Sequence, residues 1–557
     1  MSSGPATDLT ILFQGQPLKF FKPVRIETRY TVQHIPSAYL VLEPTGDAHS
    51  DLWKHSSEDA ARCQPGTEVH IQCKQTTLFS GVVVQQTWRW HDRQLALRLK
   101  HPLHRLVSTY RSQLFENQSD ADILRHLLQA QRISVGTIDG MTAKQPQLVQ
   151  WACSDWQWLR SRLSAYGVWL MPKPEQLECR FPKLAARADH KLMASRSSDT
   201  QAAVIDAEWQ FSSETQPSSL TVNYWDVAQQ AMSRTVRANA SSLGQGGLDP
   251  TKVAALSSLP WQLSHAVPLT PAEAQAQADA RLLAQHAAAV QARLTVLDSA
   301  ESLQYELGQT LALEGFEKHF EGKGIISEVR HHWQRGALRT TVAIGQDALR
   351  AVDAGLLPRA PGLTIGVVQK YRADPSNLNR LRVSVPVLGT EPLWARLGAP
   401  YASNGSGLCL YPEPGDEVVL AFLDEDPRYP VILGAMHNPK NKAPFPPSEE
   451  NAKKALIFVR GETQQGLVFD TQEISAVLES GKDRLTLHKG GQIDSEQNIA
   501  INGQKIDVVA KQSLTLTSNE QQVAINGQKV AIQAKQQFTA EGTMGVTLKG
   551  AKVDLTN

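Results

Sequence analysis

The hexapeptide Ala500-Ile-Asn-Gly-Gln-Lys505 returns unchanged as Ala524-Ile-Asn-Gly-Gln-Lys529. Around both copies, pairs of apolar residues two positions apart recur at intervals of seven to nine positions, so that three such units separate the two copies. Residues at i and i+2 of a strand point to the same face, and a short repeat with one strand per unit is typical of a β-solenoid. The Asn-Gly and Lys-Gly corners between units are expected to adopt positive φ. The pairs are Ile506/Val508, Leu514/Leu516, Val523/Ile525, Val530/Ile532, Phe538/Ala540, Val546/Leu548 and Val553/Leu555.

A single ribbon of this kind has one apolar face with nothing to cover it, and its strand edges stay unpaired. Three copies wound around one axis would bury the rows in a shared core, where each side chain contributes about 1.5–3 kcal/mol. We therefore expect a homotrimeric β-prism whose core contains Ile506, Val508, Leu514, Leu516, Val523, Ile525, Val530, Ile532, Val546 and Leu548. A single-chain β-helix is one alternative, although its turns normally need about 20 residues. An amyloid-like segment is another, which the regular Gly and Lys corners disfavour.

Residues 362–437 are predicted to form a compact all-β unit. Five short apolar segments lie at 366–368, 380–385, 393–397, 417–422 and 430–433. Turn signals such as Asp374-Pro375 and Asp426-Pro427 separate them. Five short strands with such turns predict a small barrel of the OB type. A Pro-rich hinge over 438–454 follows. The β-prism, which we also call the needle, is assigned to 455–557.

Residues 1–360 mix strands and helices and are assigned to an α+β region. Alternating apolar and polar residues predict strands at 68–74, 79–84 and 94–99. Helices are predicted after the capping residues Ser119, Ser154 and Thr270. The fold class is therefore mainly β, with α+β domains preceding an OB barrel and a trimeric intertwined β-helix.

The composition excludes several kinds of partner and compartment. Fifty-six basic and fifty-five acidic residues leave a net charge of +1, so there is no electrostatic reason to expect nucleic acid or an anionic membrane. The five cysteines are odd in number and form no CxxC pair, which argues against a zinc knuckle or a disulfide framework; they are Cys63, Cys73, Cys153, Cys179 and Cys409. With no visible signal peptide and no long apolar stretch, we expect synthesis in a reducing cytoplasm and release by a route other than a cleaved signal.

No motif of the chain predicts an enzyme, a metal site or a cofactor. His319 and the pair His331-His332 have no Cys, Asp or Glu at ligand spacing and no HExxH. Gly322-Lys-Gly324 lacks the remainder of a phosphate loop, and GxSxG is absent. An OB barrel can bind single strands, but that use needs aromatic residues over a basic groove. The sequence therefore predicts a structural protein.

Several segments resemble the VgrG and phage hub–spike family of contractile injection machines. In the barrel, the segments 378–386, 394–396, 411–418 and 426–434 match, in order, four strand and turn motifs of that family. Upstream, Ser154-Asp-Trp-Gln-Trp-Leu159 and Lys323-Gly-Ile-Ile-Ser-Glu-Val-Arg-His331 resemble the hub's helix and closing strand. The barrel motif residues are Arg380, Arg382, Trp394, Arg396, Gly415, Asp416, Glu417, Asp426, Pro427 and Gly434.

The resemblance implies an architecture and a set of partners. Three copies of 1–360, each with two barrel-like subdomains, would form a collar on the inner tube protein and contact other baseplate proteins. The barrels would form a neck, and the prism would pierce the target cell envelope. A PAAR-type tip protein would dock at the end of the prism, on Val553, Asp554, Leu555, Thr556 and Asn557. Val385-Pro386 and the short length favour an extracellular phage-tail-like particle over a type VI secretion system.

The alternative from another class is a trimeric β-prism adhesin or a glycan-binding or glycan-processing tail protein. Such a prism would need clefts with paired carboxylates and aromatic side chains. From residue 498 onward the chain has four acidic residues and one Phe, so the mechanical spike is favoured.

Overall fold

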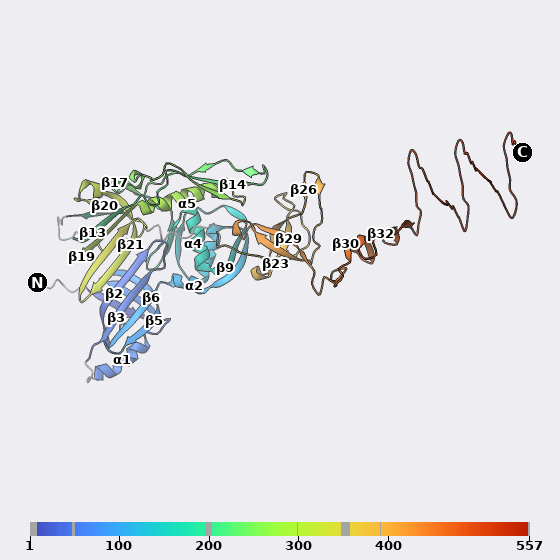
Figure 1. Ribbon diagram of the computed structural model, residues 1–557. Helices are drawn as coiled ribbons and strands as arrows, with labels where there is room; N and C mark the ends of the chain where they lie inside the picture. Colours follow the sequence, from blue (N-terminus) through green and yellow to red (C-terminus); the bar gives the residue numbers. More distant parts are fainter. Residues whose placement is uncertain are drawn as a thin grey trace. The chain divides into compact units, whose positions relative to one another are not determined.

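The computed structural model describes residues 8–46, 51–194, 203–297, 299–346, 357–389 and 391–554. The chain divides into two compact units, Met1–Ala443 and Pro444–Asn557, which can be followed by colour in Figure 1. No helix among the described residues is long and apolar enough to cross a bilayer.

The largest sheet of the first unit joins strands from both ends of the 1–346 region. β2 (Phe21–Thr31) pairs antiparallel with β21 (Gly322–Gln334), so strands far apart in sequence lie side by side (Figure 1). The three strands predicted at 68–99 are confirmed as β4, β5 and β6. Across the sheet the order is β1 (Leu9–Phe13), β4 (Glu68–Cys73), β5 (Thr76–Arg89), β6 (Gln94–Lys100), β3 (Ser37–Pro44), β2 (Phe21–Thr31), β21 (Gly322–Gln334), β22 (Ala337–Ile344), β19 (Val290–Leu297) and β13 (Val204–Phe211), with β12 (His190–Met193), β17 (Gly244–Gly246) and β20 (Thr310–Glu314) attached at the side.

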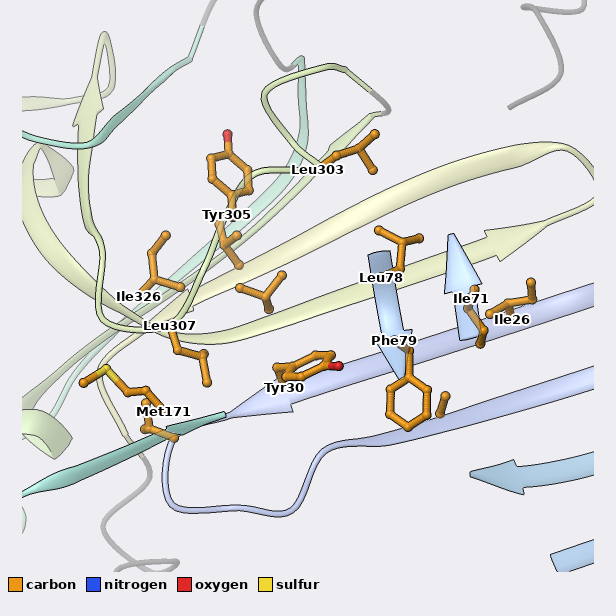
Figure 2. Packing of buried hydrophobic residues seen from close by; sticks show 14 of the residues in the cluster. Ile26, Tyr30, Ile71, Leu78, Phe79, Met171, Leu303, Tyr305, Leu307 and Ile326 are labelled. Atoms are coloured by element: carbon orange, nitrogen blue, oxygen red, sulfur yellow. The ribbon is translucent and has the colours of Figure 1, made fainter. Parts of the chain in front are cut away.

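A continuous apolar core lies against this sheet. Figure 2 shows part of it, with Ile26 and Tyr30 from β2 near Ile71 and Phe79 from β4 and β5. Tyr30 and Phe79 meet edge to face, with ring centroids 6.2 Å apart. Alternation along the strands places one side chain in two in this core, which explains why the sequence pattern predicted these strands.

Three of the described helices begin directly after the predicted capping residues. Ser119 Oγ accepts the Asp122 amide at 3.2 Å, and Ser154 and Thr270 each form a reciprocal capping box with Gln157 and Glu273. The helices are α1 (Asp51–Ala61), α2 (Arg105–Ser108), α3 (Asp120–Ala130), α4 (Asp155–Tyr166) and α5 (Pro271–Ala289).

Three smaller sheets are formed by strands between Tyr110 and His265, within the sequence range of the large sheet. Their strands are β7 (Tyr110–Ser119) with β9 (Lys144–Ser154); β10 (Trp169–Pro172), β11 (Leu177–Arg180) and β8 (Val135–Ile138); and β14 (Leu220–Asp226) with β15 (Ala231–Met232), β16 (Val236–Arg237) and β18 (Trp261–His265).

The five predicted barrel strands form a closed barrel. β23 pairs with both β24 and β28, and the single parallel contact joins β25 to β29. This order is that of an OB barrel, so the barrel and the mainly β class are confirmed, whereas the trimeric β-helix stays a prediction. The strands are β23 (Thr364–Val368), β24 (Leu381–Ser384), β25 (Pro392–Leu397), β29 (Pro430–Met436) and β28 (Glu417–Phe422), with the hairpin β26 (Ala402–Ser403) and β27 (Ser406–Gly407) between β25 and β28.

The second unit begins with an antiparallel meander and continues as an extended coil. The meander strands are β30 (Lys453–Arg460), β31 (Thr463–Asp470), β32 (Ser475–Ser480), β33 (Asp483–Leu487) and β34 (Gly491–Asp494). Residues 495–554, hereafter the tail, pair with no strand in the described chain, and their trace rises and falls as a regular wave (Figure 1).

Candidate functional site: the barrel seam and the exposed rows of the tail

On the barrel, the predicted motif residues form a stack around Trp394. Arg382 lies directly opposite Trp394 on the neighbouring strand. The guanidinium carbons of Arg380 and Arg382 lie 5.5 and 5.7 Å from the centroid of the indole ring. These are cation–π distances, at which each arginine is attracted to the ring.

Asp374 fixes Arg380 in this stack. Its carboxylate accepts Arg380 Nη2 at 2.7 Å and the backbone amides of Ser376 and Leu378. Burial alone would raise the pKa of Asp374, but these donors hold the pKa well below its usual range. The turn before β24 is therefore closed by a charged hydrogen-bond cluster.

Two strands of the preceding region attach directly to the barrel. Glu116 of β7 accepts Arg382 Nη2 at 3.1 Å. The buried side chain of Gln147, on β9, accepts the Trp394 amide at 3.1 Å and donates to the carbonyl of Arg428. Leu114 and Val149 of the same two strands belong to the apolar cluster of the barrel. The hairpin β7–β9 therefore packs on the barrel as part of its core.

We call the contact of the barrel with the preceding region the barrel seam; its polar residues are Glu116, Gln147, Glu273, Arg382, Trp394 and Arg428. Arg428 is its most deeply buried charged residue. Its Nη2 lies 2.8 Å from Asp426 Oδ2, in its own turn, and its Nη1 lies 2.8 Å from Glu273 Oε1, in the first turn of α5. All three side chains are buried. Burial would raise the pKa of Glu273, but the charges of Arg428 and Arg162 lower it. The ion pair is therefore satisfied on both sides, as a buried pair must be.

A second buried pair lies on the helices behind it. Arg162 of α4 donates to Asp120 of α3 at 2.6 Å, and both side chains are inaccessible to solvent. Tyr166 donates to the same carboxylate at 3.2 Å. Tyr429 Oη donates to the Pro268 carbonyl at 2.6 Å, so the barrel turn also bonds to the segment leading into α5. The Arg428–Glu273 pair and this bond join the barrel turn to α5 and the segment before it, whereas the Arg162–Asp120 pair joins α4 to α3.

The other predicted barrel residues have local roles. Gly415 has φ 99°, which its turn requires. Asp416 accepts the Glu413 amide at 2.9 Å, and Glu417 accepts Asn438 Nδ2 at 3.0 Å. Pro427 is buried beside Arg428, whereas Arg396 is exposed and Gly434 is half-buried.

Sequence reasoning did not single out three seam residues, Gln147, Glu273 and Arg428. One feature of the sequence could have pointed to Arg428: it is a charged residue between two prolines, in a turn that leads to an apolar strand. Nothing in the sequence linked it to Glu273.

The histidines considered as metal ligands, His319 and His331, pack in different environments. Burial lowers the pKa of His331 to about 4, and its Nδ1 is 3.0 Å from Thr340 Oγ1. His319 packs against Phe211, with ring centroids 4.7 Å apart. Across the described ranges, no group of three or more His, Cys, Asp or Glu could hold a metal ion.

In the tail, the apolar pairs predicted for a trimer core are exposed within one chain. Their first members, among them Ile506 and Leu514, have 50–57% of their surface exposed, and their second members 64–68%. This alternation is regular over five pairs: Ile506/Val508, Leu514/Leu516, Val523/Ile525, Val530/Ile532 and Val546/Leu548. Ile499/Ile501, which sequence reasoning missed, extends the row by one pair with the same difference.

The chain bends between successive pairs, at 504, 511–512, 519–521, 528, 535–536, 543–544 and 550–551. The prediction of positive φ at the glycine corners is wrong, because Gly503, Gly527 and Gly550 all lie outside that region. Each corner is an open bend between two extended segments and does not reverse the chain, so left-handed backbone is not needed. A Cβ at these glycines would lie 3.4, 3.5 and 3.4 Å from the carbonyl oxygen of the residue two positions ahead, so the same corner geometry returns at all three.

The meander carries a further exposed apolar row. Cross-strand register places Leu456 opposite Leu467, and the row continues through one residue of each following strand. Its members are Leu456, Leu467, Leu478, Leu485 and Ile493, all exposed.

The predicted tip-docking residues lie only partly in the described chain. Val553 is half exposed, and Asp554 pairs with Lys552 at 2.7 Å. Leu555, Thr556 and Asn557 lie outside the described residues.

Two family models match this chain, one before the barrel and one over the barrel. A family model described as the Alg8 N-terminal domain matches residues 4–335. A second, described as the type VI secretion system/phage-baseplate injector OB domain, matches residues 364–437 and therefore the barrel.

Curated relatives match over short stretches. The actin cross-linking toxin VgrG1 of Vibrio cholerae serotype O1 is 31% identical over 123 residues, which is 22% of this chain and 10% of that protein. The type VI secretion system spike protein VgrG3 of another Vibrio cholerae O1 strain is 32% identical over 95 residues, or 17% of this chain and 9% of that one. The chain thus spans about a tenth of these relatives.

Among solved structures, the half-lidded PdpA–VgrG complex of Francisella is similar in fold. It aligns with a TM-score of 0.57 and 10% identity, over 88% of each chain.

Proposed function

This chain belongs to the Alg8 N-terminal domain family and, with its injector OB domain, to the VgrG and phage hub–spike proteins; from that premise we propose that three copies form the central spike of a contractile injection particle. In this proposal, residues 1–360 form the hub, 362–437 the neck, 438–454 the hinge and 455–557 the needle. The role is mechanical, and no catalytic residue is assigned.

The coil of the tail is the observation that carries the proposal. Three extended segments and three bends make up each repeat of the coil, yet successive turns of the described tail form no strand pairing with one another. Strands that pair lie about 4.7–4.9 Å apart, so a turn without pairing leaves room for other strands between it and the next. Two further copies would fill that room, pair with the free backbone groups and close every edge.

The exposed side chains support the same arrangement. A soluble monomer rarely leaves a long apolar row uncovered, but the tail and the meander each present one. In a trimer both rows would face a common axis. The aliphatic residues of the meander would then cover one another just ahead of the prism.

The remaining assignments follow from membership of the family. The hub would dock on the inner tube and contact baseplate proteins. The needle would pierce the target envelope and carry a PAAR-type tip on 553–557. The buried ion pairs of the barrel seam suit this role, because a neck bonded to the hub by side chains and core can transmit axial force without hinging.

Electron-microscopy class averages of the purified full-length protein test the proposal. We expect end views with threefold symmetry and side views with a narrow extension. Particles without threefold symmetry, or without the extension, would contradict it.

A further inference from the structure

We propose that ion pairs between neighbouring chains set the register of the needle, Lys511 with Glu520 of the next chain and Glu541 with Lys549 of the next chain. This inference rests on the proposed trimer and goes further, because it assigns which residues of different chains meet.

The coil of the tail determines which segments become neighbours. One chain passes three sides of the prism before it returns to the first, since a bend follows each segment and the same glycine corner returns after every third one, at Gly503, Gly527 and Gly550. With three equivalent chains, each layer contains the same segment from all three. The segment next to it on the same side is therefore the following segment of another chain. Residues at equal offsets from the first apolar residue of each pair then lie one strand spacing apart.

Opposite charges meet at two such offsets. Lys511 lies three positions before Leu514, and Glu520 lies three positions before Val523, the first residue of the next pair. On the other side of the apolar pair, Glu541 lies three positions after Phe538 and Lys549 three positions after Val546.

The other acidic residues of the tail have partners within the chain. Lys505 Nζ lies 2.8 Å from Asp507, and Lys552 Nζ lies 2.7 Å from Asp554. At the start of the tail, Glu496 pairs with Lys482 at 2.8 Å. In the described tail, no ion pair within the chain involves Lys511, Glu520, Glu541 or Lys549. The two pairs between chains would therefore give every carboxylate of the tail a lysine.

These pairs discriminate between registers. If one chain slipped by one segment, Lys511 would face Gly527 and Glu541 would face Thr556, so both pairs would be lost. Glu520 would instead face Lys535, which leaves one pair in place of two. Apolar pairs recur in every segment and cannot prevent such a slip, whereas charges at specific positions can.

Disulfide trapping distinguishes the two registers. In a Cys409→Ser background, which removes the exposed native thiol, one variant carries Lys511→Cys with Glu520→Cys. A matched variant carries Glu520→Cys with Lys535→Cys. A disulfide needs Cα atoms about 4.4–6.8 Å apart, a distance met by adjacent strands and not by strands two layers apart. Each single-cysteine variant serves as a control.

We expect the first variant to give a covalent trimer on a non-reducing denaturing gel, with three times the mass of the 61.3 kDa subunit, and the second to run as a monomer. A trimer band from the second variant and none from the first would overturn the register. Light scattering of the reduced variants gives their native mass and so separates a wrong register from a wrong function. A protein that is a native trimer but forms no 511–520 disulfide on oxidation contradicts only the register. A native monomer contradicts both the register and the proposed trimer.

Discussion

Arg428 of the barrel and Glu273 of α5 form a buried ion pair of 2.8 Å, although 155 residues separate them in the chain. Glu273 also closes the capping box of α5 through Thr270. A residue that caps the first turn of α5 therefore also forms an ion pair with the barrel turn. This shared use couples the position of the barrel to the start of α5.

Replacing Arg428 with Met should destabilise the first unit strongly. The change leaves Glu273 and Asp426 buried without their ion-pair partner, and removal of one partner of a buried pair costs about 3–5 kcal/mol. The measurement is the free energy of unfolding in urea, followed by tryptophan fluorescence.

Arg359→Ala is the matched control for that change. Arg359 pairs with Glu425 at 3.3 Å near the same turn, but both side chains are exposed. Loss of such a pair should cost less than about 1 kcal/mol. Equal effects of the two substitutions would show that the seam is not held by its buried charge.

Acidification should destabilise the hub before it protonates the carboxylates. Burial lowers the pKa of His331 and of His101 to about 4, whereas in the unfolded chain both should titrate near the ordinary value of about 6.5. Between these values the unfolded state binds more protons. The contribution of the two neutral imidazoles to the free energy of unfolding is therefore fully present above pH 6.5. It is lost as the pH falls towards 4, by at most roughly 1.4 kcal/mol per pH unit for each ring.

Thermal midpoints at pH 7.0, 6.0 and 5.0 measure this loss, and His331→Gln supplies the control. The glutamine keeps a polar partner for Thr340 and cannot titrate, so the variant should show a smaller pH dependence than the parent, in which burial also lowers the pKa of His101. Midpoints that do not change over this range would contradict the burial of two neutral imidazoles.

Leu514→Asp should prevent assembly without disturbing the fold of the first unit. Leu514 is exposed in one chain, so the substitution costs little there, but three carboxylates would face one another in the core of a trimer. Sedimentation velocity should show the variant as a subunit, with an unchanged near-ultraviolet circular dichroism spectrum. The neighbouring change Ser513→Asp places the charge on the opposite face, and that variant should still assemble.

Deletion of residues 546–557 should leave the trimer intact and abolish binding of the tip protein. The earlier apolar pairs, from Ile499 to Phe538, would still be shared among three chains. Co-purification with a PAAR-type protein is the measurement. A truncated trimer that still captures its tip would remove the docking assignment at 553–557.

Local features of the fold were predictable from sequence because their causes are local. The five barrel strands follow from alternation and turn residues between Gly366 and Leu433. The helix starts follow from Ser119, Ser154 and Thr270, whose side chains bond to amides three positions ahead. Each of these interactions is contained within a short stretch of chain.

Contacts between distant segments were not predictable in the same way. The pairing of Arg428 with Glu273 depends on how the barrel packs on α5, which no periodicity in the sequence encodes. The prediction of positive φ at the glycine corners was wrong for a different reason. Asn502-Gly503 is compatible both with a tight left-handed turn and with an open bend, and the backbone angles there depend on how far apart successive turns of the coil lie. In the proposed trimer, the other two chains would set that spacing.

The mass of the intact protein in solution, measured by multi-angle light scattering, tests the central claim most directly. If two sister chains cover the exposed rows of the tail, the mass will be three times that of the 61.3 kDa subunit. A stable, folded species of 61.3 kDa over the micromolar range would contradict the shared core, and with it the needle.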